Sequence, residues 1–386
     1  MNLEEIRAQL PLLARTIYLD SAGAGAPPTS VYKVMVEFLE EWKDYGENWD
    51  RWLLEIVKAR DAFAQLIDCD RDQVGCIPNV TSGLAAVASS VQGKGKNVVV
   101  SELNFPTSVY VWHSLKQAGH IAEVRIVKPH NGAIPTSEFE HAIDTNTAAV
   151  CVDYVSWLNG CRENIQEVSR LAHSRGALML VDAFHALGVF PVDVERLDVD
   201  VLTCGTYKWL MGPHGSAFIY AKQEVINSLN PSIVGWHGIS DSVIARATAK
   251  EGIFEKPFDL SKVVPANNAT RFEWGTWSVI SVIGSRAALE FALKYNPKDR
   301  WPMIKKLTER LLEGLQHSAR TITSPIEEER RSGIVTFRIE KAAEVARKLQ
   351  QSGVVVAPRV NTLRVSPHFY NTEKEIDILL DLIVSS

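Results

Sequence analysis

The sequence predicts an α/β protein whose core is a doubly wound, mostly parallel β-sheet, followed by a smaller α+β region. Three observations predict this class. Between about residues 70 and 220, short β-branched apolar runs alternate with longer helical stretches. The runs are apolar throughout, as in strands covered on both faces, and the intervening helices suit parallel crossovers. A chain of 386 residues with 46% hydrophobic content can also bury a large core and form two domains.

Seven strands are expected in the first region, and ligands of such sheets bind beyond the carboxyl ends of the strands. The expected strands span residues 75–77, 97–100, 122–126, 148–154, 177–181, 199–204 and 216–220.

The second region begins near residue 291 and alternates helices with short strands. We expect helices at 301–319 and 341–351 and strands at 333–339, 354–357 and 362–365. Thr372 and Glu375 have the spacing of a capping box that opens a last helix. The predicted domains are a large one at 21–290 and a small α+β one made of 1–20 and 291–386. Residues 231–268 lack clear periodicity, and we expect long loops near the functional site there.

Charge and composition exclude several classes of partner. The net charge of −5 gives no electrostatic reason to bind nucleic acid or an anionic membrane. No stretch approaches the roughly 18 consecutive apolar residues of a membrane span. The N-terminus is acidic and amphipathic, unlike a secretory or transit signal. We therefore expect a cytoplasmic protein.

Cysteine and histidine spacing gives no support for a metal site or a disulfide framework. The five cysteines form no C-x-x-C pair, and the ten histidines show no H-x-x-x-H spacing. Most of the cysteines lie in or beside apolar runs, which favours core positions.

Asp182 and Lys208 are the most informative pair in the chain. Asp182 ends one apolar run, and Lys208 follows the next, between two aromatic residues and ahead of a Gly-Pro-His-Gly turn. Taken alone, such an acid is often a helix cap and such a lysine a solvated charge. Together they match pyridoxal phosphate (PLP) chemistry, in which a lysine amine binds the aldehyde and a carboxylate keeps the ring nitrogen protonated.

Three other segments extend this interpretation. Residues 78–83 open an apolar helix with small side chains, and unpaired N–H groups at a helix start bind phosphate. Phe105 follows a strand, where an aromatic ring would lie flat over a pyridine. Arg364 lies near the end of a short strand, and a guanidinium can bind an amino-acid carboxylate in bidentate fashion.

Six motifs, in order, resemble one enzyme family across nearly the whole chain. They are NVTSG, NFPT, VDAFHALG, TYKWLMGPHG, RFEWGT and LRVSPHFYNTEKEID. The chain resembles fold-type I PLP enzymes of the class V aminotransferase superfamily. This group holds cysteine desulfurases, selenocysteine lyases, kynureninases and isopenicillin N epimerase-like proteins.

The resemblance implies four roles at the reacting end of the cofactor. Lys208 would carry the cofactor as a Schiff base and later move the substrate proton. Asp182 would pair with the ring nitrogen, and His185 would lie near the ring hydroxyl. Phe105 would stack on the ring, as in the kynureninase NFPT segment.

The resemblance also implies a phosphate site, a substrate anchor and a homodimer. Val80 and Thr81 would donate to the phosphate, assisted by Tyr207 and by Thr276 of the partner subunit. Arg364 would hold the substrate carboxylate. Because Thr276 would come from the partner subunit, the resemblance implies a homodimer in which each active site is built from both subunits.

Two departures from the desulfurase pattern concern the reaction. No cysteine lies C-terminal to Cys204, so the thiolate that attacks the substrate sulfur in desulfurases has no counterpart. Trp157 stands where desulfurases have an asparagine near the ring hydroxyl.

We therefore expect a PLP enzyme that forms an external aldimine with an amino acid and removes its α-proton with Lys208. A lyase that cleaves a side-chain bond of C–S type is favoured. The alternatives are class V transamination, a non-catalytic PLP-binding module, and an epimerase. The epimerase needs a second acid, for which the candidates are Tyr110, His113, Tyr154 and His237.

Overall fold

The computed structural model describes residues 2–249 and 252–384, and its core is a seven-stranded sheet. The strand order is β2-β8-β7-β6-β5-β3-β4, and only β8 runs against the rest. The strands are β2 (Val74–Ile77), β3 (Asn97–Ser101), β4 (Glu123–Val127), β5 (Thr147–Asp153), β6 (Leu178–Asp182), β7 (Val201–Gly205) and β8 (Ala217–Ala221).

The predicted strands are all present, with ends that differ by a few residues. Strands β2, β3, β5, β7 and β8 are buried along their whole length, as continuous apolar runs predict. The antiparallel β8 follows β7 after a short connection because no helix lies between them. That connection carries Lys208. The α/β class and the mostly parallel sheet are thus confirmed.

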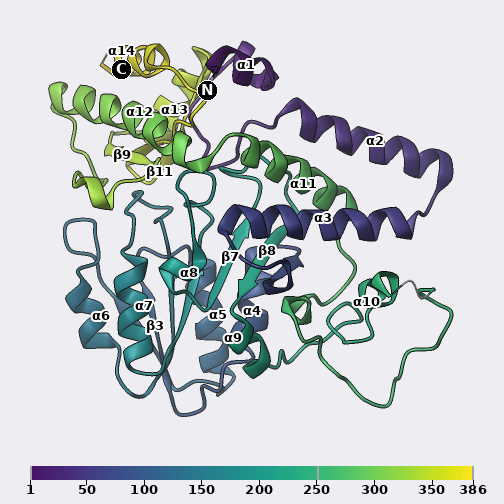
Figure 1. Cartoon of the computed structure of the whole chain (residues 1–386). Helices are drawn as coiled ribbons and strands as arrows, with labels where there is room; N and C mark the ends of the chain where they lie inside the picture. The colour runs from purple at the N-terminus through teal and green to yellow at the C-terminus, as the bar shows by residue number, and fades with distance from the viewer. Residues whose placement is uncertain (1, 250–251, 385–386) are drawn as a thin grey trace.

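Helices cover both faces of the sheet (Figure 1). One face packs on α4 (Val80–Ala88), α5 (Pro106–Gln117) and α9 (Gln223–Ser228). The other packs on α3 (Trp49–Ile67), α6 (Thr136–Ala142), α7 (Ile165–Ser174) and α8 (Val194–Leu197). Helices α2 (Thr29–Tyr45) and α11 (Val279–Lys294) lie beside α3, so the predicted domain limit at residue 290 falls in the last turns of α11.

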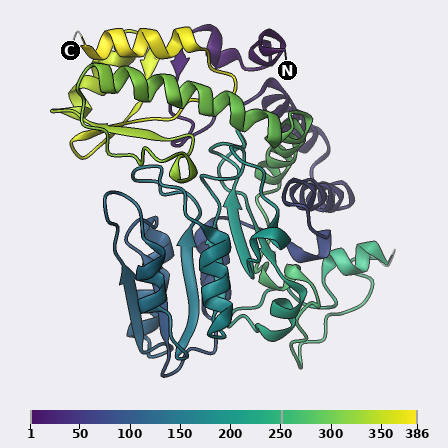
Figure 2. The ribbon, with the colours of Figure 1, turned by 60° about the vertical axis from the view of Figure 1, so that its left-hand side comes forward.

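A smaller region lies beyond one end of the sheet (Figure 2). Its three-stranded antiparallel sheet has the order β11-β12-β9, and a two-stranded parallel sheet pairs β1 with β10. The N-terminal residues therefore join this region through β1. Its elements are α12 (Pro297–His317), β9 (Val335–Arg338), α13 (Ala342–Gln351), β10 (Val354–Val355), β11 (Ala357–Arg359), β12 (Thr362–Val365), α14 (Glu373–Val384), β1 (Ile17–Tyr18) and α1 (Leu3–Ala8).

The predicted capping box at the last helix is present. The Glu375 N–H donates to Thr372 Oγ1 at 3.2 Å, and the Thr372 N–H donates to Glu375 Oε2 at 2.8 Å. Short 3-10 turns complete the element order: η1 (Pro11–Ala14), η2 (Arg71–Gln73), η3 (Ala269–Phe272) and η4 (Glu328–Arg330).

The segment 231–268 contains a helix that the sequence analysis did not predict. Helix α10 (Val243–Thr248) begins after Ser242, whose side chain accepts a hydrogen bond from the Ala245 N–H at 3.3 Å. The prediction of loops alone was wrong here because six residues are too few to display a helical period.

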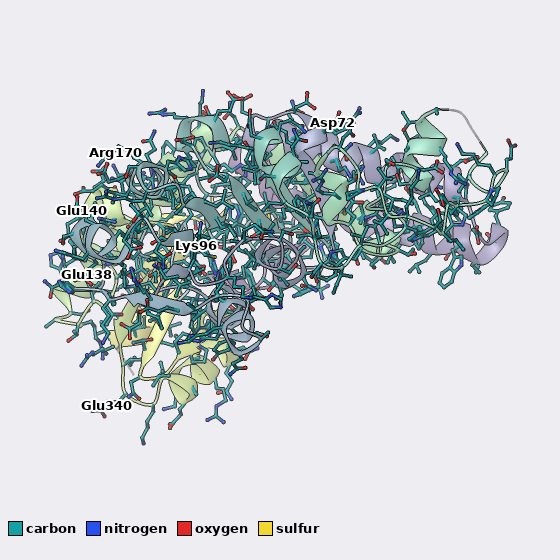
Figure 3. The ribbon with its side chains drawn as sticks, turned by 90° about the horizontal axis from the view of Figure 1, so that it is seen from below. Asp72, Lys96, Glu138, Glu140, Arg170 and Glu340 are labelled. Carbon is teal, nitrogen blue, oxygen red and sulfur yellow. The ribbon has the colours of Figure 1, made fainter. Side chains whose placement is uncertain are left out.

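Surface charge of both signs is mixed on the face seen from below, where Glu140 and Arg170 point outward (Figure 3). Across residues 2–249 and 252–384, no helix is long and apolar enough to cross a membrane. The same residues contain no cluster of three or more His, Cys, Asp or Glu side chains able to hold a metal ion. Four of the five cysteines are buried, as expected of core residues.

Candidate active site

A cavity of about 290 Å³ lies at the carboxyl ends of β5, β6 and β7. Parallel strands present their last residues at this edge, which is where such sheets bind ligands. Seven predicted site residues line the cavity: Val80, Thr81, Phe105, Asp182, His185, Tyr207 and Lys208. Thr276 and Arg364 are not among the described residues that line it. Thr276 is exposed ahead of α11, and its role across a subunit interface stays a prediction.

Asp182 is the last residue of β6 and is 5% exposed. Its Oδ1 accepts a hydrogen bond from the Phe184 N–H at 2.8 Å. Burial raises the pKa of this carboxyl to about 6, although the Phe184 N–H and the charge of Lys208 both act in the other direction. At neutral pH the group is therefore an anion in an apolar surrounding, suited to hold a cationic ring N–H.

Lys208 is hydrogen-bonded to a histidine whose tautomer the structure fixes. Lys208 Nζ lies 2.9 Å from His185 Nε2, and the Trp209 indole Nε1–H donates to His185 Nδ1 at 3.2 Å. Burial and nearby cations hold the pKa of His185 well below its usual range, so the ring is neutral. With Nδ1 accepting from Trp209, the ring hydrogen must lie on Nε2. His185 therefore donates to Lys208, and only the neutral amine can accept.

The pKa of Lys208 is shifted toward the neutral amine that this contact requires. Burial lowers it from 10.5 to about 8, against the opposing effect of Asp182. Nζ lies over the Phe184 ring at 4.2 Å and the Phe105 ring at 5.6 Å. An amine with a lowered pKa and an apolar surrounding is a nucleophile at neutral pH, as Schiff-base lysines require.

The opposite end of the cavity is formed by the start of α4. Asn79 caps this helix by accepting from the Ser82 N–H at 2.9 Å. The N–H groups of Val80 and Thr81 have no intrahelical acceptor, because the first four donors of any helix lack one. The aligned helix dipole adds positive potential there. Tyr207 also lines the cavity and is stacked on His214 with ring centroids 4.0 Å apart.

Two backbone features fit the Lys208 turn to its neighbours. Gly25 donates its N–H to the Tyr207 carbonyl at 2.7 Å. A Cβ at Gly25 would lie 2.1 Å from the Lys208 carbonyl oxygen, so only glycine allows this approach. Met211 has φ +59°, a left-handed backbone conformation that residues other than glycine rarely adopt.

Arg364 is buried beside this cavity and is paired with an acid. Its Nη2 lies 3.1 Å from Asp20 Oδ1, and its Nη1 donates to the Trp157 carbonyl at 3.4 Å. Its charge lowers the pKa values of both Lys208 and His185, which places it close to the reacting end. The guanidinium Nε has no hydrogen-bond partner among the residues that the structure describes.

The cavity also contains residues that the sequence analysis missed. Asp153 ends β5 and lines the wall beside Asp182, and His214 and Ser216 line the far end. Trp209 is fully buried and sets the His185 tautomer without lining the cavity. An acid that ends an apolar run was an available signal for Asp153.

Within residues 2–249 and 252–384, two sets of residues named from the sequence do not line this cavity, and their proximity to the site stays a prediction. The second-acid candidates Tyr110, His113, Tyr154 and His237 are not among the described residues lining the cavity. Tyr154 follows Asp153, and successive side chains of an extended segment point to opposite faces. No described residue of segment 231–268 lines the cavity either.

The donor set fits PLP. One cavity holds a lysine amine of lowered pKa, a buried carboxylate, an aromatic ring and unpaired helix N–H groups, which match the aldehyde, ring nitrogen, ring face and phosphate. Fold and site together define an α/β enzyme built around this cofactor.

Comparisons with known proteins agree. The family model described as aminotransferase class-V matches residues 17–379. The uncharacterized aminotransferase YcbU of Bacillus subtilis (strain 168) is 30% identical over 99% of this chain and 97% of its own length. A probable cysteine desulfurase of Methanothermobacter thermautotrophicus is 27% identical over 98% of this chain and 96% of its own length. A kynureninase of Bacillus mycoides is 24% identical over 97% of this chain and 89% of its own length.

Solved structures show the same fold. The apo cysteine desulfurase of Thermococcus onnurineus NA1 has a TM-score of 0.87 at 21% identity, covering 99% of this chain and 97% of that one. The cystine C-S lyase C-DES, complexed with its product cysteine persulfide, has a TM-score of 0.86 at 20% identity, covering 97% and 99%. The chain belongs to the class V aminotransferase family and has the PLP-dependent fold type I. The predicted family, fold and cofactor are confirmed.

Proposed function

We propose that this enzyme is a lyase that cleaves a side-chain bond of C–S type in an amino acid. The observation that carries the proposal is the Lys208 amine, whose Nζ lies 2.9 Å from His185 Nε2 in the same cavity as Asp182, with its pKa lowered to about 8. Such an amine can bind the cofactor and then accept the α-proton of a substrate. A relative named as a probable cysteine desulfurase and a structural neighbour named as a cystine C-S lyase support C–S cleavage, and a relative named as an aminotransferase keeps transamination as the alternative.

Each residue then has one task. PLP, when bound, supplies an electron-accepting ring that stabilises negative charge at the substrate α-carbon. Lys208 Nζ takes the α-proton, and the Asp182 carboxylate holds the proton on the ring nitrogen. Val80 and Thr81 donate backbone N–H groups to the phosphate. Arg364 binds the substrate carboxylate and so fixes which bond stands perpendicular to the ring.

A desulfurase that works through a persulfide is not favoured. That route needs a thiolate near the substrate sulfur, and the chain has no cysteine after Cys204. Cys204 itself is fully buried, and burial raises the pKa of its thiol well above the ordinary value. Loss of a sulfur-bearing group by β-elimination needs no such thiolate.

The experiment is a product assay with amino acids that bear β-thioether or β-sulfoxide groups. The proposal predicts equal release of pyruvate and ammonia by the wild-type enzyme, and none by Lys208→Ala. Racemisation without a keto acid would instead establish an epimerase. Transfer of the amino group to a second keto acid would establish an aminotransferase. A spectrum that no amino acid in the panel perturbs would favour a non-catalytic PLP-binding module.

We further propose a cytoplasmic homodimer with shared active sites, in which Thr276 of the partner subunit reaches the phosphate. Lys208→Ala and Thr276→Ala would then damage different halves of one composite site. Mixed dimers of these two variants should regain activity, because one of their two sites is intact. No recovery after subunit exchange, with both parents folded, would contradict sharing.

A further inference from the structure

Asp153 and Asp182 form a pair of buried acids at the edge of the sheet. They are register partners on the adjacent parallel strands β5 and β6, so their side chains point to the same face. Both line the cavity, and Asp153 is 7% exposed. The proposed function gives Asp182 a task at the ring nitrogen and gives Asp153 none.

The Asp153 carboxylate is bonded to the segment that carries Phe105. Its Oδ2 accepts from the Phe105 N–H at 2.6 Å, and its Oδ1 accepts from the Ser108 hydroxyl at 3.1 Å. Phe105 is the N-cap residue of α5, and its own side chain cannot cap a helix. Both oxygens of Asp153 therefore fix the first turn of α5.

Asn104 adds a second connection between the same two segments. Asn104 Oδ1 accepts from the Asp153 N–H at 3.1 Å, and its Nδ2 donates to the Cys151 carbonyl at 2.8 Å. The Trp157 indole N–H donates to the Asn104 carbonyl at 3.1 Å, and its ring packs edge-on against Phe105 at 5.6 Å. Phe105 is 42% exposed, so these polar contacts contribute more than burial of its side chain to fixing its position.

The surroundings of Asp153 disfavour a charged side chain. Burial, together with the charge of Asp182, raises the pKa of Asp153 well above its ordinary value, which shows that the ionised form is costly here. Two acids kept side by side in a cavity, at the expense of stability, are typical of functional sites.

We propose that Asp153 is a positioning residue that holds the Phe105 ring against the face of the bound cofactor. The cofactor part of this statement rests on the proposed function. The attachment of residues 103–108 to β5 does not, and it exists in the cofactor-free protein. Asp153→Asn replaces one of the two accepting oxygens by an NH₂ group. This group would face the Phe105 N–H or the Ser108 hydroxyl, both of which are donors in the native contact. Ser108→Ala removes only the hydroxyl bond and keeps the Asp153 carboxyl group with its bond to the Phe105 N–H.

The first test is hydrogen exchange in the cofactor-free protein. Deuterium uptake by residues 103–108 should be about tenfold faster in Asp153→Asn and several-fold faster in Ser108→Ala. Asp200→Asn is the matched control, since Asp200 is 6% exposed and accepts the Met179 N–H at 2.7 Å at the other end of β6. It should leave exchange in 103–108 unchanged. If residues 103–108 exchange at the wild-type rate in both Asp153→Asn and Ser108→Ala, Asp153 does not attach this segment to β5. That conclusion holds whether or not PLP binds.

The second test asks whether Asp153 acts through Phe105. Dissociation constants for PLP are measured for Phe105→Ala, Asp153→Asn and the double variant, with the induced circular dichroism of the visible cofactor band. Each single variant should weaken binding about tenfold and reduce the dichroism, and the double variant should match Phe105→Ala. If the double variant instead weakens PLP binding by the product of the two single effects, Asp153 does not act through Phe105. Failure of the wild-type chain to bind PLP would contradict the proposed function. The attachment of residues 103–108 to β5, which hydrogen exchange measures, would be unaffected.

Discussion

Trp209 donates its indole N–H to His185 Nδ1 at 3.2 Å and thereby fixes which His185 nitrogen carries the hydrogen facing Lys208. The indole is only a donor, so Nδ1 must accept and Nε2 must be protonated. A protonated Nε2 can donate to an amine but cannot accept from an ammonium. Trp209, which does not line the cavity, thus favours the neutral and reactive form of the lysine.

The first prediction concerns the pH dependence of cofactor capture. The pKa of Lys208 is lowered to about 8, so the neutral, nucleophilic fraction grows as pH rises through that value. The rate at which cofactor-free protein forms the visible band of lysine-bound PLP should rise with pH and level off above about 9. Free lysine is the control, and its rate should still be rising at that pH. A protein rate that follows free lysine would contradict the lowered pKa.

The second prediction is that Trp209→Phe raises the pKa of Lys208. Without the indole donor, His185 can place its hydrogen on Nδ1 and accept from the lysine ammonium at Nε2, which stabilises the charged form. The midpoint of the capture profile should move up by about one unit. Trp112→Phe controls for loss of volume, because Trp112 is equally buried and belongs to the core on the sheet face that packs on α4 and α5. An unmoved midpoint in Trp209→Phe would refute the tautomer assignment.

The third prediction separates substrate binding from cofactor binding at Arg364. Arg364→Lys keeps the charge but loses the planar fork, so KM for the amino acid should rise about tenfold to a hundredfold with the cofactor band intact. Asp20→Asn should lower KM, because Asp20 occupies Nη2 of the same guanidinium. An unchanged KM in Arg364→Lys, or loss of cofactor there, would show that Arg364 is not the substrate anchor.

The fourth prediction concerns a buried ion pair behind the segment that bears Thr276. Glu273 accepts from Arg60 at 2.6 Å, from the Cys76 N–H at 2.6 Å and from the Trp277 indole at 3.1 Å. Glu273→Gln leaves Arg60 as an unpaired buried charge and should lower the free energy of unfolding by about 3–5 kcal/mol.

Urea denaturation of the cofactor-free protein measures this loss. Glu328→Gln is the control, since Glu328 forms an exposed pair with Lys305. Exposed pairs contribute little to stability, so the control should unfold at the wild-type urea concentration. Equal midpoints for Glu273→Gln and wild type would contradict a structural role for the buried pair.

The sheet could be predicted because most of its strands are buried apolar runs bounded by polar residues, and β4, at the sheet edge, is the exception. One helix start was misplaced and one helix was missed, each for a local reason. Helix α12 begins at Pro297, four residues before the expected start, since Asn296 caps it and Pro302 within its early turns masks the helical pattern. Helix α10 was missed because it is too short to show a period.

Asp182 and Lys208 were predictable because each ends or follows a strand at the edge where such sheets bind ligands. Asp153 was missed although it occupies the same kind of position, because one acid sufficed for the cofactor ring. The role of Trp209 depends on a contact with His185 across 24 residues of sequence, which no local pattern reveals. The pairing of Arg364 with Asp20 likewise joins residues 344 positions apart.

Borohydride reduction of the PLP-loaded protein, followed by peptide mass mapping, tests the assignment of Lys208 most directly. Reduction converts the lysine–cofactor bond into a stable amine, so the modified peptide identifies the lysine. The structure predicts a single phosphopyridoxyl group per chain, on the peptide that contains Lys208. A group on any other lysine, or an unmodified chain after loading, would contradict the account.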